Sequence, residues 1–467
     1  MRRVVIYMFV ILLSLNLNSQ DLELEGSIKI GSSQNQSPVA GTIRWNDITD
    51  EFEGYNGEQW VSLSRSNEIW GFNQLRTFEE SDDLYPLAGS AEDCYGRDID
   101  VHNNDLIVGA WGFDVNGGTN SGKAFIYEIS SDTLIEKACL MSPNSNPLDY
   151  FGRSVSIYGD WAAVGSYLED VGGNVDQGAV YMYHFDGANW SLDTTLHASD
   201  GSAEDFFGYS IDIHDDIMVI GADRFDNGAE LDQGKAYVFK LSGGLWNETD
   251  GFLSSDGEAD DRFGIECKIY DNTIVIGAYL DDHNGLVNSG SAYVFEVDAN
   301  GLVSQSQKLV ATDLEAGDFF GRSVAVYDDV IIIGSYLHDS NNITESGQVY
   351  SFVKDNASWY QSDIISSNEA SEGDRLGRCV EICGKYMVAG AFQNDVNNLT
   401  GEPGVAYLFE RNGDNWQKVA KFTPSDATGD DFFGYSVSIN HAMAIIGAYR
   451  HDTNGNTDQG KVYLYIK

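Results

Sequence analysis

The sequence predicts an all-β protein, a seven-bladed β-propeller, and three observations support this prediction. Three glycine columns recur with a period of 56 or 57 residues through most of the 467-residue chain. Each repeat contains segments with the alternating or continuously apolar character of β-strands, and helical spacing is missing throughout. The two ends of the repeat region supply complementary parts of one blade. Repeats of four short antiparallel strands are typical of propeller blades.

The glycine columns define seven repeats, which begin near residues 93, 149, 205, 261, 318, 374 and 431. In the first column, glycine follows an aromatic residue or leucine: Gly96, Gly152, Gly208, Gly264, Gly321, Gly377 and Gly434. The second column comes thirteen residues later: Gly109, Gly165, Gly221, Gly277, Gly334, Gly390 and Gly447. The third column comes after another thirteen residues, with one extra residue in the sixth repeat: Gly122, Gly178, Gly234, Gly290, Gly347, Gly404 and Gly460.

One repeat illustrates the strands that we expect in each blade. After the first glycine, residues 210–213 (SIDI) alternate as in a half-buried strand, and residues 217–222 (IMVIGA) form a continuous apolar strand. A loop rich in Asp, Asn and Gly then leads to the third strand, residues 235–239 (KAYVF). A shorter fourth strand, such as TTLHAS at 194–199 in the preceding repeat, completes the blade.

The ends of the repeat region predict how the ring closes. The last repeat stops after its third strand, KVYLYI, at Lys467, whereas an unmatched fourth strand around Leu84 to Ala88, within FEESDDLYPLAG, precedes the first repeat. We expect this amino-terminal strand to complete the seventh blade as its outer edge. Pro86 is tolerated there because an edge strand can spare one backbone donor. Closure removes the exposed sheet edges that would otherwise aggregate.

Two segments precede the propeller, which we assign to residues 71–467. Residues 1–20 are typical of a signal peptide, because Arg2 and Arg3 precede an apolar run from Val4 to about Leu17. Residues 21–70 are expected to form a small β module, since residues 41–64 alternate around turn clusters. This module resembles short modules beside the stalks of phage-tail-like and bacterial surface fibres, which implies attachment or oligomerisation. The alternative is a hairpin that packs on the propeller.

Charge and hydropathy restrict the partners and the location. Lys plus Arg number 27 and Asp plus Glu 73, so the formal net charge is −46. Such an excess of negative charge argues against nucleic acid and anionic membranes as partners. After the leader, no stretch approaches the 18 apolar residues of a transmembrane span, and no cysteine near residue 19 suggests a lipid anchor. We therefore expect a secreted or cell-surface protein without a carboxyl-terminal sorting domain.

The repeats resemble the FG-GAP repeats of integrin α-subunit heads and of many secreted bacterial proteins. The resemblance covers residues 78–467. An aromatic-glycine pair occurs at Phe151-Gly152, Phe207-Gly208, Phe263-Gly264, Phe320-Gly321 and Phe433-Gly434, relaxed to Tyr95-Gly96 and Leu376-Gly377. The resemblance implies a β-propeller and a binding role. The integrin calcium loop has no counterpart, because a short turn such as Asp215-Asp216 connects the first two strands.

A recurrent aspartate pattern after the second glycine suggests calcium binding at a different loop. Its spacing, D-x-N-G-x-x-D in the clearest cases, offers oxygen ligands around a glycine-allowed bend, as hard cations require. The same residues also favour tight turns through bonds to their own backbone, so both interpretations stay open. The candidate ligands are Asp452, Asn454, Asp458, Asp282, Asn284, Asn288, Asp226, Asp232, Asp170 and Asp176.

A second aspartate stands three residues before each first glycine, and we expect it to accept backbone N–H bonds where one blade leads to the next. Strand direction places this crossing and the loop between the second and third strands on one acidic face. Aromatic and arginine columns should lie on the same face, where they could bind a glycan or a protein loop, or pack between blades and pair with aspartates. These residues are Trp111, Tyr167, Tyr279, Tyr336, Phe392, Tyr449, Arg97, Arg153, Arg322 and Arg378.

Common enzyme motifs are missing: the sequence has no G-x-S-x-G elbow, no H-E-x-x-H and no phosphate-binding loop. We therefore expect a non-enzymatic, exported binding or adhesion propeller that recognises a protein or glycan. The alternative is a carbohydrate-active propeller, either a lectin or a polysaccharide lyase, because catalytic carboxylates would leave no readable motif in so acidic a chain. Asp223 with Arg224, and the insertion near residues 402–404, break the repeat pattern and so mark places where a unique site could lie.

Overall fold

The computed structural model describes residues 43–46, 51–55, 60–62, 79–84, 86, 89–130, 133–394, 401–453 and 455–466. The chain divides into two compact units, residues 1–77 and 78–467. The described part of the first unit is an antiparallel sheet of β1 (Ile43–Asn46), β2 (Glu51–Tyr55) and β3 (Trp60–Ser62). The predicted signal peptide lies outside the described residues and stays a prediction.

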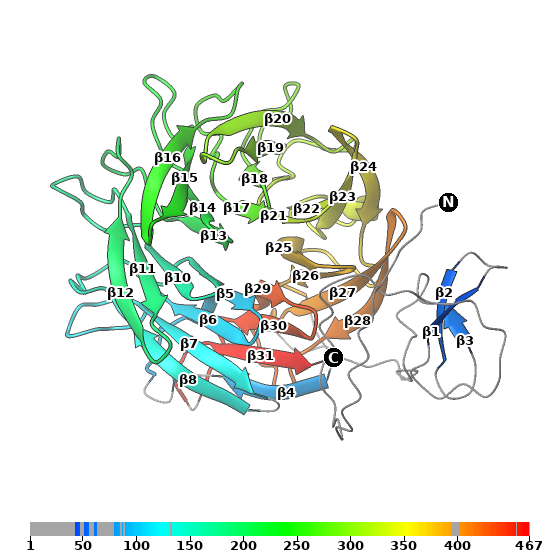
Figure 1. The fold of residues 1–467 in the computed structure, drawn as a ribbon, viewed down its shortest axis with the longest axis horizontal. Coiled ribbons are helices and arrows are strands. Elements are labelled where there is room, and N and C mark those ends of the chain that lie inside the picture. Colours follow the sequence, from blue (N-terminus) through cyan, green and yellow to red (C-terminus); the bar gives the residue numbers. More distant parts are fainter. Residues whose placement is uncertain are drawn as a thin grey trace, which may run out of the picture. The chain divides into compact units, whose positions relative to one another are not determined.

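The second unit is a seven-bladed β-propeller, as the repeats predict. Its four-stranded antiparallel sheets surround a central axis, with the first strand of each repeat nearest to the axis (Figure 1). Blades 1 to 3 are β5 (Tyr95–His102), β6 (Asp105–Ala110), β7 (Lys123–Ser130), β8 (Thr133–Leu140); β9 (Val155–Tyr158), β10 (Trp161–Ser166), β11 (Ala179–Phe185), β12 (Trp190–Leu196); and β13 (Ser210–His214), β14 (Ile217–Ala222), β15 (Lys235–Ser242), β16 (Leu245–Phe252).

The remaining blades have the same order. Blades 4 to 6 are β17 (Cys267–Tyr270), β18 (Thr273–Ala278), β19 (Ser291–Val297), β20 (Val303–Leu309); β21 (Ser323–Tyr327), β22 (Val330–Ser335), β23 (Gln348–Asp355), β24 (Ser358–Ile365); and β25 (Leu376–Cys383), β26 (Tyr386–Ala391), β27 (Val405–Asn412), β28 (Asn415–Phe422). Blade 7 is β29 (Phe433–Ile439), β30 (Met443–Ala448), β31 (Lys461–Ile466) and β4 (Glu79–Leu84).

The ring closes through β4, which pairs antiparallel with β31 at the outer edge of blade 7 (Figure 1). This confirms closure by an amino-terminal strand but corrects its position. The strand is Glu79–Leu84 rather than Leu84 to Ala88, so Pro86 follows the strand instead of lying within it. The Pro86 carbonyl accepts hydrogen bonds from Gly89 N (2.9 Å) and Gln459 Nε2 (3.0 Å). Pro86 therefore begins the turn that leads from blade 7 into blade 1.

The second glycine column sets the distance between neighbouring blades. A Cβ atom on Gly221 would lie 2.0 Å from the carbonyl oxygen of Gly264, which belongs to the next blade. Gly264 has a φ of +95°, a conformation that glycine adopts without strain. The same contact closes the ring, because a Cβ on Gly447 of blade 7 would lie 2.3 Å from Gly96 O of blade 1. Blades 7 and 1 therefore meet as any other two blades do.

The aromatic residue before the first glycine is part of the core of each blade. Phe207 is fully buried and meets Tyr237 edge to face, with ring centroids 5.4 Å apart. Equivalent pairs, such as Phe320 with Tyr350, recur around the ring. Because each blade buries both sheet faces against its neighbours, the second strands, such as β14 and β22, are buried along their whole length. This explains their continuous apolar sequences.

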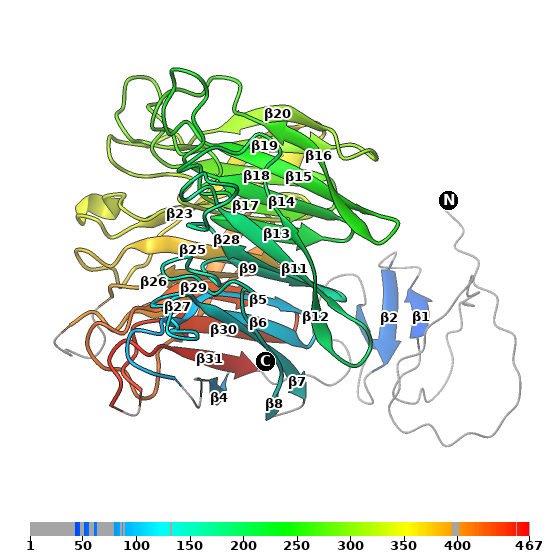
Figure 2. The same ribbon diagram turned by 90° about the vertical axis from the view of Figure 1, so that its left-hand side faces the viewer.

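Long loops gather on one side of the propeller (Figure 2). We call this side the loop face; it is formed by the loops between the second and third strands and by the crossings between blades. Backbone hydrogen bonds join the two kinds of segment: Glu204 N donates to Val175 O and Phe207 N to Gln177 O, both at 2.8 Å. The predicted placement of crossings and loops on one face is therefore correct.

Candidate functional site: the loop face and the central channel

The loops of the loop face share one closing hydrogen bond. In blade 4, Asp282 Oδ1 accepts the backbone N–H of Asn288 at 2.7 Å, and Asn288 has a φ of +54°. The aspartate side chains themselves are exposed. The same bond spans six residues in five other blades, from Asp114, Asp170, Asp226, Asp339 and Asp452. The pattern therefore builds rigid turns whose aspartates reach solvent.

The calcium prediction concerns these same loops. In each predicted pair of carboxylates, the first aspartate uses Oδ1 for the turn, and Oδ2 is left for another ligand. Asp176, Asp232 and Asp458 occupy the left-handed position that Asn288 holds in blade 4. Asn454 lies outside the described residues, and Asn284 Nδ2 contacts His283 Nε2 at 2.7 Å. Calcium binding at these loops stays a prediction.

The second aspartate column has the turn role that the sequence predicts. Asp261 is buried at the crossing into blade 4, and its Oδ2 accepts the backbone N–H of Glu258 at 2.7 Å. Burial raises the pKa of Asp261 and of Asp149 to about 7, and that of Asp93 and Asp205 to about 6. Equivalent backbone bonds occur at Asp93, Asp205, Asp318, Asp374 and Asp431.

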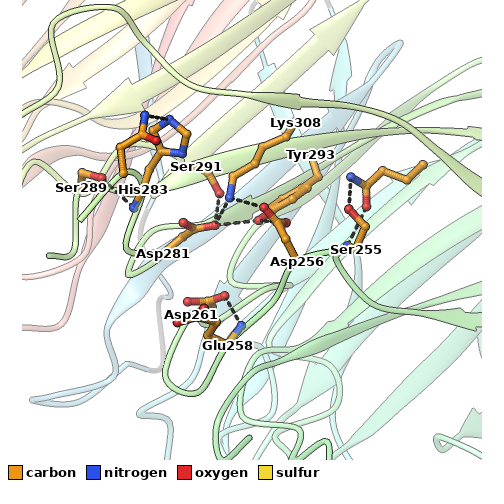
Figure 3. A network of polar contacts seen from close by, with 12 residues as sticks. Ser255, Asp256, Glu258, Asp261, Asp281, His283, Ser289, Ser291, Tyr293 and Lys308 are labelled. Carbon is orange, nitrogen blue, oxygen red and sulfur yellow. Dashed lines mark hydrogen bonds and ion pairs between the residues drawn. The ribbon is translucent and has the colours of Figure 1, made fainter. Parts of the chain in front are cut away.

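A polar network fastens the loop of blade 4 to its outer strands (Figure 3). Asp281 is buried and accepts hydrogen bonds from Lys308 Nζ (2.7 Å), Ser291 Oγ (2.8 Å) and Tyr293 OH (2.6 Å). Lys308 also donates to Asp256 at 2.8 Å. Every strong donor of this network has a partner, so the network serves structure and holds the loop in place.

The predicted aromatic column packs largely between blades. Tyr449 lies against Tyr435 with ring centroids 4.6 Å apart, and Phe392 contacts the same ring at 5.3 Å. Phe392 and Tyr449 are buried, whereas Trp111, Tyr167, Tyr279 and Tyr336 are half-buried. In blade 3 the column contains Asp223, which is buried, and burial raises its pKa to about 6. The rings therefore support the centre of the loop face rather than stand free on it.

The four predicted arginines come together at the loop-face end of the central channel. They line a cavity of about 50 Å³ together with Tyr209 and Tyr435. Arg97, Arg153, Arg322 and Arg378 are each less than a tenth exposed. Their guanidinium groups lie over aromatic rings. Arg97 Cζ lies 4.4 Å from the centroid of the Tyr435 ring, and Arg378 Cζ lies 4.2 Å from the same centroid. Arg153 lies 4.2 Å from the Tyr209 centroid. We call these four arginines the arginine layer.

Below the arginine layer, charged side chains join the innermost strands of neighbouring blades. The channel-facing edge of such a strand has N–H groups without a strand partner, and carboxylates supply acceptors. Asp100 Oδ2 accepts Ile157 N at 2.8 Å, and Asp212 Oδ2 accepts Ile269 N at 2.7 Å. Lys268 of blade 4 donates to Glu381 of blade 6 at 2.5 Å. The channel is therefore held together by polar contacts.

The opposite channel mouth carries a site that sequence reasoning missed. A cavity of about 270 Å³ is lined by His102, Tyr158, His214, Tyr270 and Tyr327, with Asp212 and Glu381 also among its walls. Successive rings of this group lie with centroids 4.1, 5.1, 4.8 and 4.5 Å apart. Burial lowers the pKa of His102 and His214. All five rings stand six residues after a first glycine, so the repeat spacing could have revealed them.

The loop face also carries an exposed apolar group that the sequence analysis passed over. Val175, Leu231 and Val287 occupy the same loop position in blades 2, 3 and 4, and Leu148 lies in the crossing from blade 1 to blade 2. These four side chains are 54%, 57%, 57% and 52% exposed. We call them the aliphatic arc. Blades 5 and 7 have Thr344 and Thr457 at the same position, so the arc is confined to one part of the ring.

The fold and the glycine columns define a closed propeller of short repeats with a channel and a loop face. Comparison with protein families then identifies the repeats: the chain belongs to the FG-GAP repeat family. Six segments match, which together cover more than half of the chain: residues 78–127, 135–183, 190–239, 246–295, 303–352 and 416–465. The matched segments leave out much of blade 6, in which leucine replaces the aromatic residue before Gly377.

Two further comparisons found similar proteins. A segment of 126 residues is 24% identical to integrin alpha-2 of Mus musculus, which is 25% of this chain and 10% of that protein. The chain thus matches a tenth of this relative's length. A solved structure of a protein from Lactobacillus plantarum matches 75% of this chain and 90% of its own, with 14% identity and a TM-score of 0.48. Among the described residues, no helix has the length and apolar character needed to cross a membrane.

Proposed function

We propose that this protein is a non-enzymatic, exported propeller that binds another protein through its loop face, at or outside the cell surface. The aliphatic arc carries this proposal, because its side chains are more than half exposed on loops that are otherwise rich in aspartate. Exposed apolar side chains rimmed by polar residues are typical of protein interfaces. The leader predicted at residues 1–20 and the membership of a family that includes integrin α-like proteins support the location.

The rigidity of the loop face favours recognition over catalysis. Six loops are closed by the same aspartate bond, and their backbones are tied to the crossings. A preorganised surface loses little conformational entropy on binding, so more of its contact energy contributes to affinity. The excess of carboxylates favours a partner with a cationic surface. The module of residues 21–70 then supplies attachment or oligomerisation, and calcium bound at the loops would stiffen the same surface.

The experiment compares the wild-type protein with Leu231→Asp and Val287→Asp variants in binding to an array of extracellular proteins. We expect saturable binding by the wild type and at least a tenfold loss in each variant, an effect of about 1.4 kcal/mol or more. Leu302→Asp is the matched control, because Leu302 is 53% exposed in a hairpin between β19 and β20. Equal binding by all four proteins would contradict the proposal.

A carbohydrate-active propeller is the second candidate, and the cavity at the opposite channel mouth favours it. Tyrosine and histidine rings above carboxylates are suited to hold a sugar, and tyrosine or histidine could also serve as the base of a lyase. A glycan array and an assay for polysaccharide degradation separate the candidates. Glycan binding that Tyr270→Ala abolishes would establish a lectin, and degradation of a polysaccharide would overturn the non-enzymatic proposal.

A further inference from the structure

The arginine layer gathers positive charge in a protein whose formal net charge is −46. The position directly after the first glycine holds arginine in four blades, tyrosine in two and isoleucine in one: Arg97, Arg153, Tyr209, Ile265, Arg322, Arg378 and Tyr435. Like charges held this close repel one another, and Arg153 contributes to a lowered pKa of Arg97, after the larger effect of burial. Burial also acts to lower the pKa of Arg153 and Arg378, but the surrounding tyrosines raise it above the usual arginine value. Such a cluster is stabilised by an anion.

The protein's own carboxylates neutralise this cluster incompletely. Glu266 Oε2 lies 3.8 Å from Arg322 Nη1, near the limit of an ion pair. Asp98 also lines the cavity, but its Oδ2 accepts the backbone N–H of Val155 at 2.8 Å. Among the described residues, Arg97, Arg153 and Arg378 form no ion pair with a carboxylate within 4 Å, although Asp98 and Asp223 lie near enough for Arg153 to act against the rise in their pKa. These side chains are more than nine-tenths buried and line the cavity.

Tyr435 is in direct contact with the arginine layer, and the arginines affect its pKa. The Arg378 nitrogen Nη2 donates to Tyr435 OH at 2.5 Å, and the guanidinium groups of Arg97 and Arg378 both lie over the tyrosine ring. Burial alone would raise the pKa of this phenol, but Arg378, Arg97, Arg322 and Arg153 lower it to about 7. Tyr449 also contacts the ring, with centroids 4.6 Å apart. The low pKa of Tyr435 therefore reflects the positive charge of the four arginines around it.

Size and surroundings restrict the anion. The cavity is small, about 50 Å³, and four guanidinium groups line it, so it suits a small anionic group. The loop face around the channel carries exposed aspartates such as Asp226 and Asp282, which repel a polyanion such as a sulfated glycan. A ligand with one isolated carboxylate on a neutral or cationic surface meets both conditions. Guanidinium groups also bind a carboxylate through paired hydrogen bonds.

We propose that the arginine layer binds one carboxylate group, presented by a protein partner that covers the loop face. Arg97, Arg153 and Arg378 would hold its oxygens, and the exposed aspartates would contact cationic residues around it. This inference rests on the proposed function for the identity of the partner, but the carboxylate site itself can be tested without any partner.

The test titrates the exported protein with acetate at constant ionic strength, with chloride as the replaced anion, and follows absorbance at 295 nm near pH 7.5. A bound carboxylate offsets the positive charge that favours the phenolate of Tyr435, so its pKa rises and the absorbance falls. We expect a saturable decrease that Tyr435→Phe abolishes. Sulfate titrated in parallel distinguishes a carboxylate site from a sulfate site: binding of sulfate at least tenfold tighter than acetate would overturn the proposal.

Variants separate the site from general anion effects. We expect Arg97→Gln and Arg153→Gln to weaken acetate binding, measured by calorimetry, by at least about tenfold, the effect of losing a charge-assisted hydrogen bond. Arg450→Gln is the control, because Arg450 is an exposed arginine in a loop of the same face. Arg97→Lys and Arg153→Lys keep the charge if a glutamine variant fails to fold. Absence of saturable acetate binding in the folded wild type, or equal affinity in all variants, would overturn the proposal.

The proposal and the function on which it depends can fail separately. If acetate does not bind, but Leu231→Asp still abolishes protein binding, the carboxylate site is wrong and the loop-face interface stands. If acetate binds to the arginine layer, but no extracellular protein binds to the wild type, the protein-binding function is wrong and the anion site stands.

Discussion

Gly221 and its equivalents lie where one sheet rests on the next, so their missing side chain sets the spacing of the whole ring. A Cβ on Gly221 would meet a backbone oxygen, which belongs to the neighbouring blade and cannot turn away as a flexible side chain would. The third glycine column has a second reason besides the same kind of close approach: a Cβ on Gly234 would lie 2.0 Å from Phe263 O, and Gly234 also has a φ of +86°. The two columns therefore share the close approach of the next blade, and the third column also needs a left-handed backbone.

We expect Gly221→Ala to lower the free energy of unfolding by about 1–3 kcal/mol, the usual effect of overpacking. Gly228→Ala is the matched control, because Gly228 has a φ of +68° with open space around it, so only backbone strain of about 1 kcal/mol applies. Urea unfolding followed by circular dichroism measures both. Equal destabilisation by the two substitutions would show that the blades can move apart.

The buried turn aspartates predict an unusual dependence of stability on pH. The pKa of Asp261 is about 7 in the folded protein and about 4 in an unfolded chain. Between these values the folded protein binds more protons than the unfolded chain, so the free energy of unfolding decreases as the pH rises. Asp149, Asp93 and Asp205 act in the same direction. Lysine-bonded carboxylates such as Asp256, whose pKa is lowered, lose their contribution only at more acidic pH.

We therefore expect a melting temperature a few degrees higher at pH 5.5 than at pH 7.5. Asp261→Asn keeps an oxygen acceptor for the Glu258 N–H but cannot titrate, so this variant should gain less on acidification. Differential scanning calorimetry at both pH values checks the expectation. A wild-type melting temperature that rises with pH over this interval would contradict it.

At the scale of the element, each loop between the second and third strands is a rigid turn with an outward carboxylate. The turn and calcium interpretations now make different predictions. As a turn residue, Asp282 needs one oxygen for Asn288 N, which asparagine can also supply. As a calcium ligand, it needs its negative charge.

Calcium binding predicts that millimolar Ca²⁺ raises the melting temperature by a few degrees relative to a chelator, because a ligand of the folded state stabilises it. Asp282→Asn and Asp452→Asn should retain the turn but reduce this rise. Mg²⁺ at the same concentration controls for general screening of the acidic surface. A melting temperature that does not respond to Ca²⁺ would assign the loops to the turn role alone.

At the scale of the whole molecule, stability depends on β4, which comes from the opposite end of the repeat region and covers the edge of β31. Without β4, the N–H and C=O groups of β31 would be exposed along one side, and exposed strand edges promote association. Blade 7 would also have three strands where the other blades have four. The ring is therefore closed by a pairing between the two ends of the propeller.

We expect a deletion through Leu84 to lower the melting temperature and cause aggregation, as measured by light scattering and scanning fluorimetry. A deletion through Thr77 is the matched control, because it keeps β4 and removes only the first unit. The control should melt at the wild-type temperature, and a lower mass in solution would show that residues 21–70 mediate oligomerisation. A deletion through Leu84 that stays soluble and equally stable would contradict the role of β4.

The sequence determined by itself the number of blades, the order of strands and the residues at each turn. Each blade has the same steric requirements, so the same residue type recurs at the same position of every repeat. Spacing alone identifies Gly221, Phe207 and Asp261 as members of recurrent columns. The closing strand begins about five residues before the position that the sequence predicts, because a single irregular strand has no column to align it. Turn carboxylates and calcium ligands have the same residue types and spacing, so the sequence alone does not decide between these two roles for the loop aspartates.

Only the tertiary structure decided which side chains from different repeats come into contact. The arginines, more than 50 residues apart in sequence, converge because every first strand faces the same axis. Tyr158 and His214 come together at the other mouth for the same reason, although neither is unusual in its own repeat. Closure of the ring turns positions that are equivalent along the chain into neighbours in space. The local sequence therefore defines the blades, whereas the candidate sites exist only in the closed ring.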